Sequence, residues 1–163
     1  MKRRLCLMFP PLLWLGACST PQGGTTVPVA ARIESGVDAR RRHDVVLQAM
    51  AMLDRNYTYG GKRLHTGFDC SGLVSFVYRE SAGLTLAGSA ADLARLTRPV
   101  AHEQAEPGDL VFFNTLGSAF SHVGIYIGQR RFIHAENERT GGKTSNMDSR
   151  YWAQRFEGFR TLF

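Results

Sequence analysis

The chain has 163 residues, of which 44% are hydrophobic and 21% are charged. This length and apolar content suffice for one ordinary hydrophobic core, so we expect a single folded domain. The formal net charge of +6 includes Lys2, Arg3 and Arg4, which lie in a segment that we expect to be removed. The remainder carries 17 Lys and Arg against 14 Asp and Glu, a charge of +3, so no nucleic-acid partner is expected.

The first 17 residues have the pattern of an export signal. Three cations at positions 2–4 form a positively charged n-region, and an apolar run from Leu5 to Ala17 follows. The run is too short, and too interrupted by Pro10 and Pro11, to span about 30 Å of hydrocarbon as a helix. We therefore expect residues 1–17 to be a cleaved signal peptide rather than a transmembrane anchor.

The end of this segment, Leu15-Gly16-Ala17-Cys18, resembles the bacterial lipobox. In that motif the cysteine is lipidated at sulfur and becomes the first residue of the mature protein, so the resemblance implies a lipid anchor on Cys18. Ser19, rather than Asp, follows the cysteine, which resembles the sorting pattern for the outer membrane of a Gram-negative cell. The implied location is the periplasmic face of that membrane; ordinary secretory cleavage nearby is the alternative.

Residues 18–37 are rich in Ser, Thr, Pro and Gly and contain too little apolar surface to pack. We expect this segment to be a lipidated, flexible tether, with an r.m.s. span of roughly 25 Å. The folded domain is then expected over residues 38–163.

The domain is predicted to begin with a helix between Asp38 and Asp54. Apolar residues recur there at helical spacing, at Val46, at Ala49 or Met50, and at Leu53. Three arginines at positions 40–42 lie in the first turns of this helix. We interpret them as a solvated face, with contact to anionic lipid or glycan as the weaker alternative.

The stretch FDCSGLVSFVY, residues 68–78, places one cysteine at the start of a second predicted helix. Asp69 is its expected N-cap and Gly83 its expected stop. Unpaired backbone N–H groups at a helix start favour a thiolate, and a nearby histidine lowers the thiol pKa further. Because Cys6 leaves with the signal and Cys18 is assigned to lipid, Cys70 is left alone, either buried and inert or retained for its reactivity.

The second half of the chain reads as strands. Residues 105–114 form a turn, with Asp109 as a turn residue, followed by a strand, and residues 121–128 and 130–136 form a hairpin around Gly128 and Gln129. Trp152 and Phe156 are at helical spacing and are expected in the core. Because helices come first and strands later, the predicted class is α+β.

Two histidines of the five in the domain, His122 and His134, are embedded in apolar strand patterns. Either alone would usually be a satisfied structural residue. Two on neighbouring strands, together with a cysteine at a helix start, favour a nucleophile with a proton-carrying ring and a ring-orienting group. An odd-length slip of the hairpin would send the two rings to opposite faces, and the sequence does not fix its register.

Five ordered motifs now carry a resemblance to a known family. NYTYGG, GFDCSGLVSFVY, PGDLVFF, SHVGIYIG and RFIHA resemble the motifs of the NlpC-type cell-wall peptidases, which are papain-like cysteine hydrolases. The resemblance covers about Ala39 to the C-terminus. It implies a papain-like α+β fold in which N-terminal helices, with the nucleophile at a helix start, pack on an antiparallel sheet.

The resemblance also implies roles for individual residues. Cys70 is the expected nucleophile, His122 the general base and then acid, and His134 the ring-orienting third member. Tyr57 is expected to contact the substrate or the tetrahedral intermediate. Asp69 and Ser71 match positions that in some members hold the free amine of a stem peptide.

Each role has an alternative. Asp69 is equally well explained as an N-cap alone, and Ser71 by helix-start polarity. Glu136 or Asn137 replaces His134 as the third member if the register slips. One departure from the family concerns residues 86–89, which read Leu-Ala-Gly-Ser where many members carry a Pro-Arg pair, so fine specificity is open.

The reaction implied by the resemblance is hydrolysis of peptidoglycan stem peptides, typically between γ-D-glutamate and meso-diaminopimelate. A related thiol amidase or acyltransferase, and a non-catalytic wall-binding lipoprotein, are the alternatives. No cofactor is expected, and no Cys or His cluster has the spacing of a zinc site. The expected partners are stem peptides and, through Cys18, a membrane; an activating or adaptor protein is left open.

Overall fold

The computed structural model describes residues 29–163, and the side chains of residues 38–163. The helices are α1 (Val29–Met50), α2 (Cys70–Ala82), α3 (Ala90–Leu96) and α4 (Arg150–Ala153), with a 3-10 turn η1 (His102–Gln104). The strands are β1 (Lys62–Arg63), β2 (Gly67–Phe68), β3 (Arg98–Val100), β4 (Leu110–Phe113), β5 (His122–Gly128), β6 (Arg131–Ala135), β7 (Gly142–Asn146) and β8 (Phe156–Thr161). The predicted signal peptide and the expected lipidation site Cys18 lie outside the described residues.

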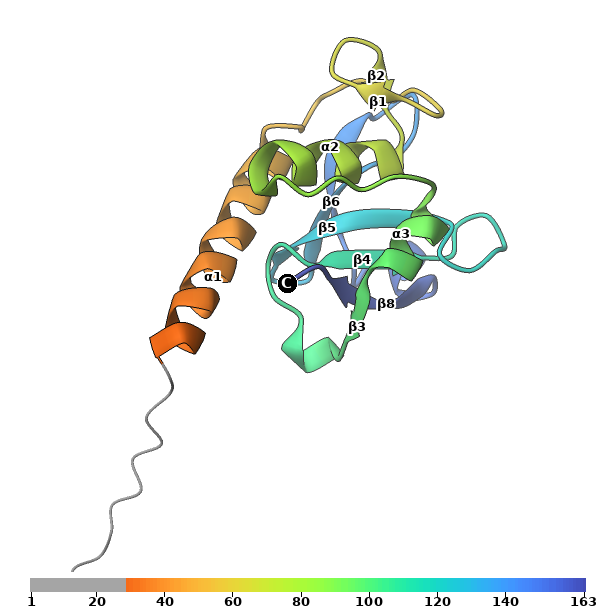
Figure 1. The fold of residues 1–163 in the computed structure, drawn as a ribbon. Coiled ribbons are helices and arrows are strands. Elements are labelled where there is room, and N and C mark those ends of the chain that lie inside the picture. The colour runs from red at the N-terminus through yellow and green to blue at the C-terminus, as the bar shows by residue number, and fades with distance from the viewer. Residues whose placement is uncertain (1–28) are drawn as a thin grey trace, which may run out of the picture.

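Six strands form one antiparallel sheet in the order β3-β8-β4-β5-β6-β7, and β1 and β2 form a small separate ribbon. Figure 1 shows α2 lying across the sheet near β5 and β6, with α1 beside it. Helices α1, α2 and α3 all contact β5 or its neighbours. The predicted α+β class is confirmed.

Strand alternation gives the sheet two apolar faces. Leu110 and Phe112 of β4 pack in the core cluster that includes the helices, whereas Val111 and Phe113 pack in a second cluster with Trp152 of α4. Successive side chains of a strand point to opposite faces, so a run of four buried residues in β4 serves both clusters. The sheet is therefore covered on both sides.

Helix α1 begins at Val29, nine residues before the expected Asp38. Residues 29–37, which we assigned to a flexible tether, are helical. Composition accounts for the difference: Pro28 is the last proline of the tether, and the residues after it include Ala, Arg and Glu, which favour helix. No helix in the described part of the chain is both long and apolar enough to cross a membrane.

The interpretation of all three arginines as a solvated face is wrong for Arg42. Arg40 and Arg41 are exposed, but the Arg42 side chain is only 16% exposed and its Nη1 lies 2.6 Å from Oδ1 of the fully buried Asp109. Arg42 also pairs with Glu106 at 3.2 Å. Asp109 does occupy the expected turn, where its Oδ2 accepts a hydrogen bond from the Glu106 N–H. This ion pair ties α1 to the sheet.

Trp152 and Phe156, although at helical spacing, do not lie on one helix. Helix α4 ends at Ala153, and Phe156 begins strand β8, where it pairs with Phe113. Both aromatic side chains nevertheless pack in the second apolar cluster, Trp152 as a buried member and Phe156 as a partly buried one. The spacing of four residues between Trp152 and Phe156 therefore indicated that both pack in the core, although they do not share a helix.

Candidate active site

Cys70 is the first residue of α2, as predicted. Asp69 caps the helix, because its Oδ1 accepts hydrogen bonds from the Gly72 N–H at 2.6 Å and from Ser71 Oγ at 3.1 Å. The loop before the ribbon packs tightly on this helix start: a Cβ added to Gly72 would lie 2.0 Å from the Gly61 carbonyl oxygen. Glycine at position 72 therefore lets the loop and the helix start approach closely.

The thiol of Cys70 does not have the lowered pKa that its position suggested. Burial raises the pKa of Cys70 to about 11 and outweighs the N–H groups of Val123, Ser71 and Cys70 itself, which favour the thiolate. The helix start supplies the expected donors, but the sulfur is largely removed from water. In the protein without substrate the site therefore favours a neutral thiol.

His122 and His134 lie on one face of the sheet. Nε2 of His122 is 2.8 Å from Nδ1 of His134, so the two rings are hydrogen-bonded. Gly124 follows His122 by two residues on β5, and a Cβ there would lie 2.6 Å from the Phe132 ring and 3.2 Å from His134 Cβ. The absence of a side chain at Gly124 leaves space for the pair.

A β-bulge decides this arrangement. The hairpin turns at Gln129 and Arg130, both with positive φ, and Gly128 pairs with Arg131. The register then shifts between Tyr126 and Gly128, so that Ile125 pairs with Ile133. Without that shift Ile125 would oppose His134 and the two rings would face opposite sides of the sheet.

The hydrogen-bonded series continues beyond His134. Its Nε2 lies 2.9 Å from Ser145 Oγ on β7, and the indole ring of Trp152 packs against both histidines, with centroids 5.3 Å from His122 and 4.9 Å from His134. Burial lowers the pKa of His122 to about 4 and that of His134 well below its usual value. Both rings are therefore neutral near neutral pH in the protein without substrate.

One cleft of about 440 Å³ brings the predicted residues together. Cys70, His122, Tyr57, Asp69 and Ser71 all line it. Burial raises the pKa of Tyr57, and the neighbouring Cys70 adds to this effect. The sequence-predicted nucleophile, base and substrate contacts thus share one hollow, and Asp69 and Ser71 also form the helix cap that the alternative reading proposed.

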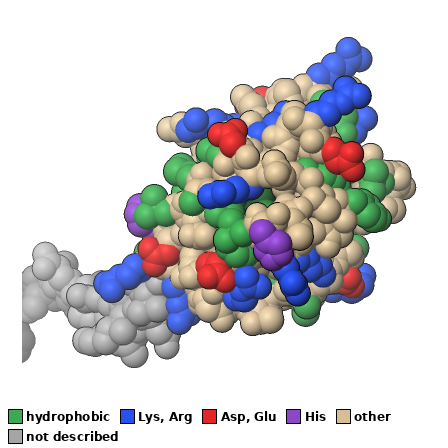
Figure 2. Space-filling view, turned by 90° about the horizontal axis from the view of Figure 1, so that it is seen from above, with side chains coloured by type: hydrophobic (Ala, Val, Ile, Leu, Met, Phe, Trp, Pro, Cys, Tyr) green, Lys and Arg blue, Asp and Glu red, His purple; other side chains and the backbone are tan. Residues whose placement is uncertain are grey.

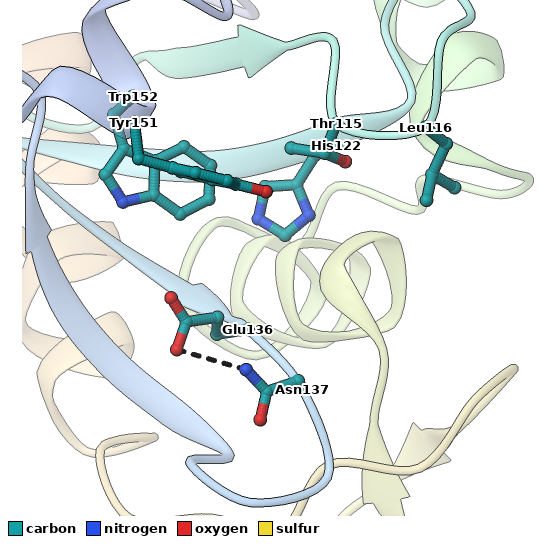
Figure 3. A pocket seen from close by; sticks show the side chains of 7 residues that line it. All are labelled: Thr115, Leu116, His122, Glu136, Asn137, Tyr151 and Trp152. Atoms are coloured by element: carbon teal, nitrogen blue, oxygen red, sulfur yellow. Dashed lines mark hydrogen bonds between the residues drawn. The ribbon is translucent and has the colours of Figure 1, made fainter.

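His122 also lines a second hollow, of about 430 Å³ (Figure 3). Tyr151 and Trp152 form one wall, and Glu136 and Asn137, at the end of β6, form the other. Cys70 lines only the first hollow, whereas His122 lines both. A substrate chain that reaches across His122 would occupy both hollows.

The alternatives for the third member are placed elsewhere. His134, and neither Glu136 nor Asn137, hydrogen-bonds the His122 ring. Glu136 instead bonds Lys143 at 2.7 Å, and the exposed Asn137 donates to Glu136 at 3.2 Å. Residues 86–89, which differ from the pattern of many family members, do reach the site, because Ser89, the N-cap of α3, lines the cleft.

Three groups that lie next to the site residues were not predicted from the sequence. Ser145 and Lys143 lie on β7, which carries no apolar alternation, and the N–H of Val123 faces the Cys70 sulfur only because of the tertiary fold.

Among the described residues no group of His, Cys, Asp or Glu is arranged to hold a metal ion. On the face seen in Figure 2, basic and acidic side chains are interspersed.

Comparison with known proteins places this geometry in a family. The NlpC/P60 family model matches residues 54–161. A probable endopeptidase p60 of Listeria grayi is 40% identical over 69% of this chain, the γ-DL-glutamyl hydrolase of Bacillus subtilis is 37% identical over 71%, and the murein DD-endopeptidase MepH of Escherichia coli is 34% identical over 69%. The aligned region spans only 21%, 28% and 43% of the lengths of these relatives.

A solved structure agrees. A Staphylococcus aureus protein, described as similar to a lipoprotein of the NLP/P60 family, superposes with a TM-score of 0.66 at 33% identity, covering 76% of this chain and 41% of that one. The papain-like fold implied by the motif resemblance is confirmed. Because the family model covers more than half of the sequence, this chain belongs to the NlpC/P60 family.

Proposed function

We propose that this chain is a cysteine endopeptidase that hydrolyses the stem peptides of peptidoglycan. One observation carries the proposal: Cys70 stands at a helix start in the same cleft as His122, which is the first ring of the series His122, His134, Ser145. The name of the Escherichia coli relative, a murein DD-endopeptidase, supports peptidoglycan as the substrate class, and the names of the other two relatives, an endopeptidase and a γ-DL-glutamyl hydrolase, support hydrolysis of a peptide-type bond.

In the first step His122 accepts the Cys70 proton as the sulfur attacks the substrate carbonyl carbon. The tetrahedral oxyanion that results needs hydrogen-bond donors. At the start of α2 the Gly72 N–H is already bonded to Asp69, but the N–H groups of Cys70 and Ser71 face the sulfur and are available for the oxyanion. Collapse of this intermediate breaks the C–N bond. His122 gives its proton to the departing amine, and the acyl group remains on sulfur.

In the second step His122 acts as a base toward water. Water adds to the thioester carbonyl, His122 takes its proton, and the proton returns to sulfur as the acid product leaves. The departing amine in the first step must lie on the His122 side, because it receives its proton there. His122 lines both hollows, and Cys70 does not line the one formed by Tyr151 and Trp152, so we propose that this hollow receives the leaving portion of the substrate.

For the bond itself we propose γ-D-glutamyl-meso-diaminopimelate. The Bacillus subtilis relative, named a γ-DL-glutamyl hydrolase, supports this choice. The Escherichia coli relative, named a murein DD-endopeptidase, makes a DD cross-link the second candidate. Both reactions use the same acyl-transfer chemistry, so the substrate and not the mechanism separates them.

The test is digestion of two purified muropeptides, an uncrosslinked tetrapeptide and a DD-crosslinked dimer. Product masses and newly exposed amines are read by mass spectrometry for the wild type and for Cys70→Ser. We expect the tetrapeptide to be cut before diaminopimelate and the variant to be inactive. Cleavage of the dimer alone would transfer the proposal to the DD bond.

Two controls bound this experiment. Ser75→Ala, in the interior of the same helix, should retain activity, which separates loss of the thiol from disturbance of α2. Retained activity in Cys70→Ser would remove the nucleophile assignment. Release of the amino sugar from the stem, with no peptide bond cut, would indicate the amidase alternative.

We also propose that the protein is a lipoprotein anchored through Cys18 at the periplasmic face of the outer membrane. The lipobox-like sequence before Cys18 and the Ser at position 19 support this. In Cys18→Ala the protein should appear in the soluble periplasmic fraction, while the wild type sediments with outer membrane. Sedimentation of the variant with the membrane would contradict lipidation at Cys18 as the anchor.

A further inference from the structure

An ion pair lies beside the two hydrogen-bonded histidines. Nζ of Lys143 is 2.7 Å from Oε2 of Glu136. Lys143 lies directly opposite His134 in the β6–β7 ladder. Glu136 follows His134 by two residues, and it lines both hollows that His122 lines. The carboxylate end of the pair therefore borders His122, and the ammonium end borders His134.

We propose that the Glu136–Lys143 pair holds the positive charge of acyl transfer on His122 and keeps His134 neutral. Glu136 and Lys143 are then positioning residues that act through the two rings. The inference deepens, and rests on, the proposed roles of Cys70 and His122.

The charges of the pair act on different rings. The Glu136 carboxylate favours the charged form of His122 and partly offsets the burial that lowers the His122 pKa. Lys143 acts in the opposite direction on His134: after burial and the charge of His122, it is a further cause of the lowered His134 pKa. A proton shared between the rings is therefore favoured on His122.

Glu136 is held in its charged form. Burial works to raise its pKa, but hydrogen bonds from Lys143 and from Thr140 Oγ1, the latter 2.9 Å long, together with the charges of Lys143 and His122, lower the pKa of Glu136 overall. Asn137 donates a third hydrogen bond at 3.2 Å, and the carboxylate cannot turn away from the ring without losing these bonds. Its field at His122 is thus preorganised.

The proposed acceptor role of Nδ1 of His122 fixes the direction of the hydrogen bonds, because the hydrogen of the neutral His122 ring must then lie on Nε2. Nδ1 of His134 accepts from this Nε2–H, and the Nε2–H of His134 donates to Ser145 Oγ. Nδ1 of His122 is then left to accept the proton of Cys70. Proton transfer gives a thiolate and an imidazolium with no change in net charge, and Glu136 stabilises the imidazolium.

Other titratable groups face the same space. Tyr57, Tyr59, Asp69 and Cys70 line the cleft, and Tyr151 lines the second hollow. Asp69 is the other carboxylate among them, and its Oδ1 is engaged by the helix cap. Glu136 is the carboxylate that borders both hollows, so we assign the tuning to it.

The test is the rate at which iodoacetamide alkylates Cys70 in the full chain between pH 5 and pH 10. Glu136→Gln should slow alkylation at pH 7 by about threefold to tenfold, because the thiolate–imidazolium form loses a stabilising charge. Lys143→Gln should have the opposite effect, because it removes a cation beside the two rings while Thr140 Oγ1 still holds the Glu136 carboxylate. Glu136→Asp should retain part of the wild-type rate, and Glu103→Gln, an exposed control on η1, should match the wild type.

Opposite changes in the alkylation rate of Glu136→Gln and Lys143→Gln would support the proposal. If only the loss of the ion pair mattered, both variants would change the rate in the same direction. Unchanged rates, or slowing in both, would overturn the proposal. If a variant fails to fold, ¹⁵N shifts of the wild type decide: His134 must stay neutral and protonated at Nε2 from pH 5 to 8, and a charged His134 would overturn the proposal. Because alkylation needs no substrate, failure to cleave muropeptides would overturn the proposed function without changing this result.

Discussion

Nε2 of His122 lies 2.8 Å from Nδ1 of His134, and the second ring is bonded in turn to Ser145. This series runs across three neighbouring strands, β5, β6 and β7. The first ring borders the cleft, whereas the second is fully buried. His134 can therefore orient His122 without meeting the substrate, and its effect on activity must pass through the first ring.

His134→Ala should lower kcat of muropeptide cleavage by about a hundredfold or more, because His122 loses the acceptor that fixes its orientation. Ser145→Ala removes only the outer bond and should lower kcat by about threefold to tenfold. Steady-state kinetics on the tetrapeptide measures both. Thr144→Ala, a neighbour on the same strand, is the control. Equal losses in the His134 and Ser145 variants would contradict the order of the series.

The sequence was sufficient where a local pattern determines the structure. Asp69 before a polar helix start and Gly83 after the apolar run specify the limits of α2, and Gly83 indeed adopts a left-handed conformation. The α+β class follows from the order of elements. The family motifs then predicted which residues would share the cleft, because their order along the chain is itself informative.

The remaining features depend on long-range packing. The face on which His134 lies depends on one extra residue between Tyr126 and Gly128, and alternation of apolar residues does not reveal a bulge. The thiol pKa depends on how much protein covers Cys70, which a helix-start argument leaves out. Arg42 looked solvated because its partner Asp109 lies 67 positions away in the chain.

The buried histidines predict a loss of stability in mild acid. Their folded-state pKa values lie below the usual value, to about 4 for His122, so the unfolded chain binds more protons below pH 6.5. The free energy of unfolding should thus be fully retained above pH 6.5. It should fall between pH 6.5 and about 4 by about 1.4 kcal/mol per pH unit for each ring.

Urea unfolding at pH 7.5, 6 and 5 measures this slope. His122→Gln should reduce it, and His43→Gln, which removes an exposed ring from α1, should leave it unchanged. The prediction fails if the wild type and His122→Gln lose stability equally over this range.

The Arg42–Asp109 pair predicts a large structural effect far from the cleft. Arg42→Met should cost about 3 kcal/mol of unfolding free energy, because it leaves the buried Asp109 carboxylate without its cation. Arg41→Met, at the exposed neighbouring position, should cost little. Chemical denaturation of the two variants measures the difference, and comparable stabilities would show that α1 is held by its apolar contacts alone.

The opposed pKa shifts of Cys70 and His122 lead to the last prediction. Burial disfavours charge on each group alone, so a thiolate forms at neutral pH only when its proton passes to His122. In His122→Ala that acceptor is missing, and the thiol must ionise against its raised pKa, from the ordinary 9.0 to about 11. Such a rise reduces the thiolate fraction at pH 7 by about a hundredfold.

Alkylation of His122→Ala by iodoacetamide should therefore be slow at pH 7 and should increase only above pH 9.0, the ordinary pKa of the thiol. The wild type should react faster at pH 7, and His65→Ala, which removes an exposed ring near the ribbon, should follow the wild type. Circular dichroism establishes that each variant is folded. Coincident profiles for the wild type and His122→Ala would mean that His122 does not accept the Cys70 proton, and both steps of the proposed acyl transfer would then need another base.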